Sequence, residues 1–272
     1  MSNFLKRTLS GFLYVLLVVG SVLLSQYYFF LVVFALVAGF AVREFHKITN
    51  QQADVNVNSF VGFFGALLLF VLTYLYASGT TGYKVFSIYG LFLLLAIISE
   101  LYRCKANPLH NWAYFVTGQV VVALPFSLLN FILYIHDLKP WILLAMFVTI
   151  WVNDTGAYLV GVSLGKHRLF ERISPKKSWE GFAGGAATAL VSGYVFSNFI
   201  PELSLVNWLV LSEIIVVFGT FGDLVESLMK RTVDLKDSGS IIPGHGGLLD
   251  RFDSMLLAAP VTLLYLNLVF GN

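Results

Sequence analysis

The residues best suited to chemistry gather in one polar stretch, from Ser227 to Asp253. It holds basic side chains that can neutralise phosphates, glycines that let backbone N–H groups approach an anion, and two aspartates three residues apart. In chain order these are Lys230, Arg231, Lys236, Gly244, Gly246, Gly247, Asp250, Arg251 and Asp253. A flexible loop of balanced charge explains the charges but not this gathering. The stretch therefore predicts a site for a phosphate-bearing ligand.

The two aspartates of this stretch are suited to a hard cation. Asp250 and Asp253 are expected at the start of the last helix, with both carboxylates on one face. Magnesium is commonly held by one or two carboxylates, while phosphate oxygens and water complete its shell. The pattern therefore favours a magnesium ion shared between the protein and a bound phosphate.

A second polar segment runs from Gly165 to Gly181. Ser178 is expected to cap a helix whose first turn contains Glu180, where a carboxylate suits the helix dipole. A helix N-terminus beside Lys176 and Lys177 is suited to an anion. On its own, this segment is better explained as an ordinary basic loop.

Acidic residues also lie in or at the ends of predicted membrane spans, namely Glu100, Asp154, Glu213, Asp223 and Glu226. Charged groups at membrane depth are costly and often mark function. Asp154 and Asp223 each lead directly into a polar loop, which favours a functional role. A polar seam between helices or a salt bridge explains Glu100 and Glu213 equally well.

The elements that must position these residues are membrane helices. Hydrophobic residues make up 58% of the 272 residues and charged residues 12%, whereas about 25% of a soluble domain is charged. The formal net charge of +2 gives no case for nucleic-acid binding. A span needs about 20 apolar residues. We predict an all-α, polytopic bundle with spans near 9–25, 27–45, 58–77, 84–102, 110–134, 140–162, 179–199, 206–226 and 254–270.

Basic residues set the expected orientation. With the N-terminus in the cytosol, all of the 17 lysines and arginines except Lys84 and Lys139 fall on the cytosolic side. The polar loops 163–178 and 227–253 then share that side, and the C-terminus lies outside. We divide the chain into N-terminal membrane helices of unclear role, 1–140, and a C-terminal catalytic region, 141–272.

The stretch from Ser227 to Asp253, here called the signature segment, resembles the signature of the phosphatidate cytidylyltransferases, or CDP-diacylglycerol synthases. The family pattern is a serine, Lys-Arg, Lys-Asp, His-Gly-Gly and Asp-Arg-x-Asp. In this sequence it is matched by Ser227, Lys230-Arg231, Lys236-Asp237, His245-Gly246-Gly247, Asp250-Arg251 and Asp253. The segments 174–181 and 153–158 also look like this family, and the first half resembles it only in hydropathy.

The resemblance implies that CTP and phosphatidic acid react to give CDP-diacylglycerol and pyrophosphate with Mg²⁺, in a cavity open to the inner leaflet. It implies an integral membrane protein, in the cytoplasmic membrane if the source is bacterial, with a site that faces the cytosol. It is also compatible with a second cation, monovalent or divalent, and with a homo-oligomer. Implied metal ligands are Asp223, Asp250 and Asp253. Implied catalytic, phosphate-binding residues are Lys230, Arg231, Lys236, His245 and Arg251. Implied substrate-binding or supporting residues are Ser174, Lys176, Lys177, Asp154, Ser227, Gly246 and Gly247.

Three other functions remain open from the sequence. A CTP-dependent lipid-alcohol kinase would use the same nucleotide, but it needs a base for a neutral hydroxyl group. An ion-coupled transporter would use Asp154 and Asp223 as ion sites, yet the polar residues gather in the last third of the chain. A purely structural membrane subunit leaves the signature segment unexplained.

Overall fold

The computed structural model describes residues 3–25, 28–135, 140–201, 203–235, 237–239 and 246–271, with side chains from Thr8 onward. The described chain is mostly helical. Its α-helices are α1 (Asn3–Leu23), α2 (Phe29–Thr49), α3 (Ser59–Ala77), α4 (Phe86–Ser99), α5 (Pro108–Thr117), α6 (Leu124–Tyr134), α7 (Trp141–Leu164), α8 (Trp179–Phe199), α9 (Leu205–Arg231) and α10 (Leu249–Phe270). A two-stranded antiparallel hairpin, β1 (Arg168–Phe170) with β2 (Ser174–Ser178), joins α7 to α8.

Seven helical segments of the described chain are long and apolar enough to cross a membrane. They are Phe29–Thr49, Ser59–Ala77, Tyr83–Tyr102, Pro108–Tyr134, Trp141–Leu164, Leu205–Arg231 and Leu249–Phe270. Two of the predicted spans are not in this set. The apolar part of α1, Thr8–Leu23, is shorter, and α8 is rich in glycine, alanine and serine.

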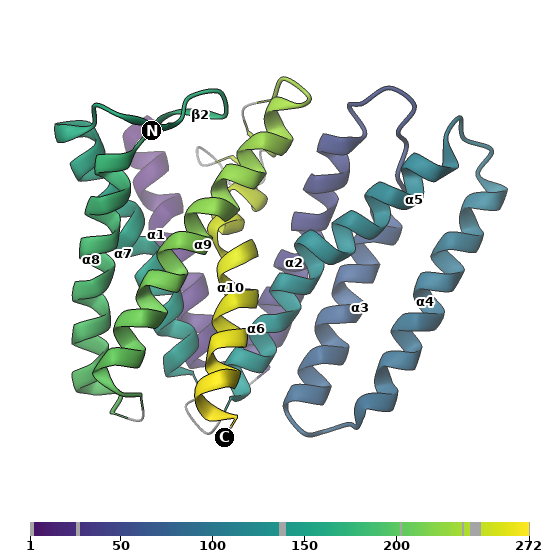
Figure 1. Cartoon of the computed structure of the whole chain (residues 1–272). Coiled ribbons are helices and arrows are strands. Elements are labelled where there is room, and N and C mark those ends of the chain that lie inside the picture. The colour runs from purple at the N-terminus through teal and green to yellow at the C-terminus, as the bar shows by residue number, and fades with distance from the viewer. Residues whose placement is uncertain are drawn as a thin grey trace.

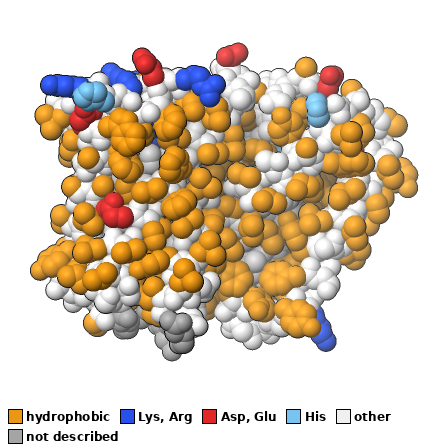
Figure 2. All heavy atoms as spheres, in the orientation of Figure 1, with side chains coloured by type: hydrophobic (Ala, Val, Ile, Leu, Met, Phe, Trp, Pro, Cys, Tyr) orange, Lys and Arg blue, Asp and Glu red, His pale blue; other side chains and the backbone are white. Residues whose placement is uncertain are grey.

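The helices pack side by side and run mostly between the same two ends of the molecule (Figure 1). Helices α7 and α8 lie toward one side, α3 and α4 toward the other, and α10 lies between them (Figure 1). Helix α2 packs on α3, α7 on α8, and α9 on α10. Hydrophobic side chains cover most of the visible face between its two ends, and charged side chains gather at the end that carries the hairpin (Figure 2).

The start of α10 is anchored by the aromatic ring of Phe252, which is 2% exposed. This ring contacts aromatic rings from four other helices, namely Tyr14 of α1, Phe34 of α2, Phe126 of α6 and Phe147 of α7. Because Phe252 stands between Arg251 and Asp253, its packing fixes the backbone that carries both polar side chains.

Small residues bring α7 and α8 close together. A Cβ atom at Gly184 would lie 2.4 Å from Val160, and one at Gly185 would lie 2.3 Å from Asn153 Oδ1. Small side chains at such spacing let helix backbones approach closely. Helix α8 therefore lies directly against the stretch of α7 from Asn153 to Val160, which contains Asp154.

Two local features differ from a plain reading of the sequence. The fifth predicted span, near 110–134, consists of α5, a π-helical stretch at Gly118–Ala123, and α6, whose second residue is Pro125. The π-helical stretch shifts the hydrogen-bond register before the proline, which lacks an N–H donor. The hairpin lies in a loop for which no strand was predicted.

Candidate active site at the polar end of the bundle

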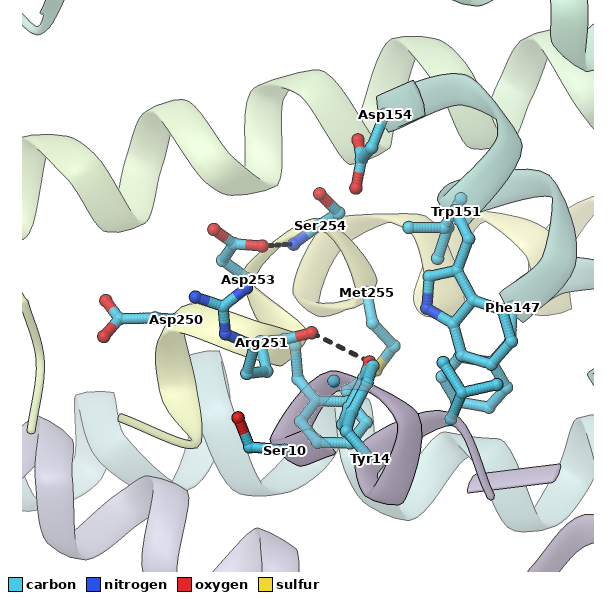
Figure 3. A pocket seen from close by; sticks show the side chains of 14 residues that line it. Ser10, Tyr14, Phe147, Trp151, Asp154, Asp250, Arg251, Asp253, Ser254 and Met255 are labelled. Atoms are coloured by element: carbon cyan, nitrogen blue, oxygen red, sulfur yellow. Dashed lines mark hydrogen bonds between the residues drawn. The ribbon is translucent and has the colours of Figure 1, made fainter. Parts of the chain in front are cut away.

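Three carboxylates from three helices form the centre of the candidate site. Asp154 of α7, Asp223 of α9 and Asp253 of α10 are close enough to interact electrostatically. Lys177, near the end of β2, reaches this cluster, and its Nζ lies 2.6 Å from Asp223 Oδ2. Figure 3 shows the carboxylates of Asp154 and Asp253 on the same side of α10, beside Ser254. We call these three aspartates the carboxylate cluster.

Two cavities meet at this cluster. The first, of about 330 Å³, lies between α1, α7 and α10 (Figure 3), and its lining includes Ser10, Tyr14, Trp151, Asp154, Arg251 and Asp253. The second, of about 270 Å³, lies between α7, α8, α9 and the hairpin, and its lining includes Asn153, Asp154, Tyr158, Lys176, Lys177 and Asp223. Asp154 and Ser254 line both cavities. Groups bound in the two cavities would therefore both face Asp154, with Asp253 on the first side and Asp223 on the second.

A glycine sets the distance between α9 and α10 at the cluster. A Cβ atom at Gly222 would lie 2.5 Å from the backbone oxygen of Asp253. The absence of a side chain lets the two helices touch there, which brings Asp223 beside Asp253. The hydroxyl of Ser227 donates a hydrogen bond of 3.1 Å to Asp223 Oδ1 and orients this carboxylate.

Asp250 lies apart from the carboxylate cluster. Its Oδ1 accepts a hydrogen bond from Lys230 Nζ at 2.8 Å, and its Oδ2 accepts from the backbone N–H groups of Gly247 at 2.8 Å and Ser238 at 3.0 Å. Figure 3 shows its carboxylate pointing away from Asp154. The sequence predicted Asp250 and Asp253 on one face. Both line the first cavity, but these donors hold the Asp250 carboxylate against Lys230 and the backbone of residues 238 and 247.

Lys230 is also engaged by protein carboxylates. Its ammonium group lies 2.5 Å from Glu226 Oε2 and 2.8 Å from Asp250 Oδ1, and Glu226 is 1% exposed. The sequence predicted Lys230 to bind phosphate. In this structure it joins α9 to the first turn of α10, so its geometry suits holding Asp250 in place.

The other predicted residues are spread over the same end of the bundle. Arg251 lines the first cavity and Lys176 the second. Arg231 donates to the backbone oxygen of Leu235 at 3.2 Å, and Ser174 begins β2 opposite Phe170. Gly246 has a φ of 83°, a conformation that favours glycine. The predicted residues Lys236 and His245 lie outside the described part of the chain.

Several residues around the site were missed from the sequence, and most come from the first half. Tyr14 of α1 donates a hydrogen bond of 3.1 Å to the backbone oxygen of Arg251, and Ser10 lines the same cavity. Glu44 of α2 contacts the start of α10. Its acidic type inside an apolar span is a signal that could have found it. Tyr14 gives no comparable signal, because an aromatic residue is ordinary in a span.

The apolar helices are long enough to span a membrane, so the chain is an integral membrane protein. Carboxylates and lysines gather toward one end of these helices and form a site suited to anionic ligands. The model of the cytidylyltransferase family matches residues 5–269, and the chain belongs to this family.

Named relatives agree with this family over most of the chain. A phosphatidate cytidylyltransferase of Bacillus subtilis is 34% identical over 269 residues, which cover 94% of each chain. One of Haemophilus influenzae is 31% identical over 94% of this chain and 96% of its own. One of Staphylococcus haemolyticus is 47% identical over a shorter stretch of 121 residues.

Proposed function

We propose that this chain is a phosphatidate cytidylyltransferase, which makes CDP-diacylglycerol and pyrophosphate from CTP and phosphatidic acid. The observation that carries the proposal is the meeting of two cavities at one carboxylate cluster. A transfer between a nucleotide and a lipid needs two binding spaces that open onto one reacting centre. Relatives with this activity in their names match the chain over nearly its whole length.

The chemistry of the substrates fits the side chains of the site. A phosphate monoester is mostly ionised at neutral pH, because its second pKa is about 6, so the attacking lipid phosphate needs no strong base. The difficulty is to bring two anions together, and positioning with charge neutralisation can supply most of the rate. Lys176 and Lys177 would hold the CTP phosphates in the second cavity, and Arg251 would face the lipid phosphate in the first.

The carboxylate cluster fits a bound magnesium ion. The three carboxylates lie near one another, and the nearby cations are the Lys177 ammonium and the Arg251 guanidinium. Among the described residues, no three His, Cys, Asp or Glu side chains form a ready metal site. Asp223 and Asp253 would therefore hold the ion together with phosphate oxygens and water, as magnesium prefers. When bound, Mg²⁺ would stabilise negative charge on the phosphoryl group in transfer.

We also propose nine spans with a cytosolic N-terminus and a site at the cytosolic end. The two ends of the chain lie at opposite ends of the bundle (Figure 1), which suits an odd number of spans. Helices α1 and α8 would be the first and seventh spans. The positive-inside rule assigns the end that carries the hairpin to the cytosol.

Labelling of single cysteines tests this topology. In a Cys104→Ser background, which removes the one native cysteine, we expect Glu171→Cys, exposed in the hairpin connection, to react with a membrane-impermeant thiol reagent only in permeabilised cells. Lys84→Cys, exposed at the opposite end, should react in intact cells. Reaction of both positions from the same side would contradict the proposed topology.

The position of the transferred phosphorus tests the proposed reaction. Attack of the lipid phosphate on the α-phosphorus of CTP puts an α-label into the lipid fraction and a γ-label into pyrophosphate. A lipid kinase would instead put the γ-label into the lipid and leave the α-label in CDP. Purified protein with phosphatidic acid and each labelled CTP should give the first pattern, and diacylglycerol, which carries the free hydroxyl that a kinase needs, should take up neither label. The second pattern would establish the kinase and overturn the proposal.

A further inference from the structure

One acidic side chain of the first half reaches the start of α10. Glu44, in the last two turns of α2, is 1% exposed. Its Oε2 accepts hydrogen bonds from the backbone N–H of Leu249 at 2.9 Å and from the hydroxyl of Ser238 at 3.3 Å. Within the described chain no basic side chain forms a salt bridge with Glu44. The Glu44 carboxylate therefore accepts hydrogen bonds from two parts of the signature segment, Ser238 and the start of α10 at Leu249.

Glu44 shares these partners with Asp250. The backbone N–H of Ser238 donates to Asp250, as does that of Gly247. Carboxylates from α2 and α10 thus hold residues 237–239 against residues 246–249. We call these two short ranges the neck of the signature segment.

Two glycines of the neck make room for Glu44. A Cβ atom at Gly239 would lie 2.3 Å from Glu44 Oε1, and one at Gly247 would lie 2.5 Å from Glu44 Oε2. Contacts this short do not occur for real Cβ atoms, so any side chain at Gly239 must displace the carboxylate. The backbone of the neck and the side chain of Glu44 therefore fit one another closely.

We propose that Glu44 is a positioning residue for the transfer reaction, acting through the neck and the first turn of α10. That turn carries Arg251 and Asp253, which line the first cavity. Glu44 itself lines neither cavity, so it acts through other residues. The proposal rests on the proposed function and gives the second helix a role in a site otherwise built mainly from the last third of the chain.

Substitution of Glu44 separates this role from a general effect on folding. Glu44→Ala removes both hydrogen bonds, and we expect kcat to fall by about 10- to 100-fold, the range seen when supporting groups of a site are removed. The KM for CTP should change by less than about twofold, since Lys176 and Lys177 do not contact the neck. Glu44→Gln keeps an acceptor oxygen for Leu249 and Ser238 and should restore most of kcat.

A control and two contrary results complete this test. Glu213→Gln changes an acidic residue of α9 that lies in an apolar groove, and it should leave kcat unchanged. The inference is overturned if Glu44→Ala matches the wild type in kcat, or if it lowers only the yield and thermal stability of the protein. The activity of the wild type is measured first, and an inactive wild type would contradict the proposed function. The role of Glu44 is judged from the ratio of the variant kcat to the wild-type kcat.

A double-mutant cycle tests the contact itself. Gly239→Ala alone should lower kcat by about tenfold, because the new methyl group displaces the Glu44 carboxylate. In the Glu44→Ala background the same change should cost less than about twofold, because the obstacle is gone. The cycle is repeated with Glu44→Asp, whose shorter side chain also withdraws from Gly239, in case the alanine variant does not fold. Additive losses in both backgrounds would overturn the inference.

Discussion

Asp223→Asn is expected to lower the turnover of CDP-diacylglycerol synthesis by on the order of 10²–10³-fold, comparable to the loss of one group that stabilises the transition state. Asparagine has the same shape and still accepts the hydrogen bond from Ser227, so the loss reports the missing charge. The carboxylate faces Lys177 and interacts with Asp253. If it also holds Mg²⁺, the variant needs a higher magnesium concentration for half-maximal rate.

The matched control for this variant is Asp234→Asn. Asp234 is an exposed acidic residue just beyond α9, with a φ of 54° that asparagine also tolerates. Its turnover and magnesium dependence should equal those of the wild type. Near-normal turnover of Asp223→Asn at saturating Mg²⁺ would remove Asp223 from the proposed metal ligands.

Asp250→Asn is also expected to lower turnover by about 10²-fold or more, in the range seen when a group supporting a site is lost, but with the magnesium dependence unchanged. Its carboxylate accepts hydrogen bonds from Lys230, Ser238 and Gly247. Asparagine offers one acceptor oxygen, and its amide group would face an N–H donor. The Lys230 ammonium would keep Glu226 as its remaining carboxylate partner among the described residues.

The magnesium titration decides between the two roles considered for Asp250. The sequence predicted it as a metal ligand, whereas its hydrogen bonds suit a residue that holds the neck of the signature segment. An increase in the magnesium concentration for half-maximal rate, as large as that expected for Asp223→Asn, would support the metal-ligand role. An unchanged value with low turnover would support the structural reading.

The sequence predicts the membrane class well because a bilayer imposes a simple rule on hydropathy and length. Seven of the predicted spans meet that rule in the described structure. The hairpin between α7 and α8 was not predicted, since β1 has only three residues and β2 carries lysines and serines rather than alternating apolar residues. The π-helical stretch was not predicted either, since hydropathy does not distinguish a π-helical stretch from an α-helix.

The carboxylate cluster was partly predictable, because Asp154 and Asp223 are costly charges within apolar spans. The partners of Asp250 and Lys230 were not predictable. They depend on where the backbone of residues 238 and 247 returns to α10, which is set by tertiary contacts. Tyr14 was missed for the same reason, and the contacts of Tyr14 and Glu44 both cross more than 200 residues of sequence, although the acidic type of Glu44 in an apolar span was a usable signal.

The origin of the cluster in α7, α9 and α10 has a consequence for how the protein is made. Ribosomes deliver the N-terminal helices first, so α2 enters the membrane well before the helix that it holds. A nascent chain that ends before Leu249 has the lysines of the hairpin but lacks Arg251, Asp253 and one wall of the first cavity. The first cavity is therefore complete only once the last helix has been synthesised and inserted.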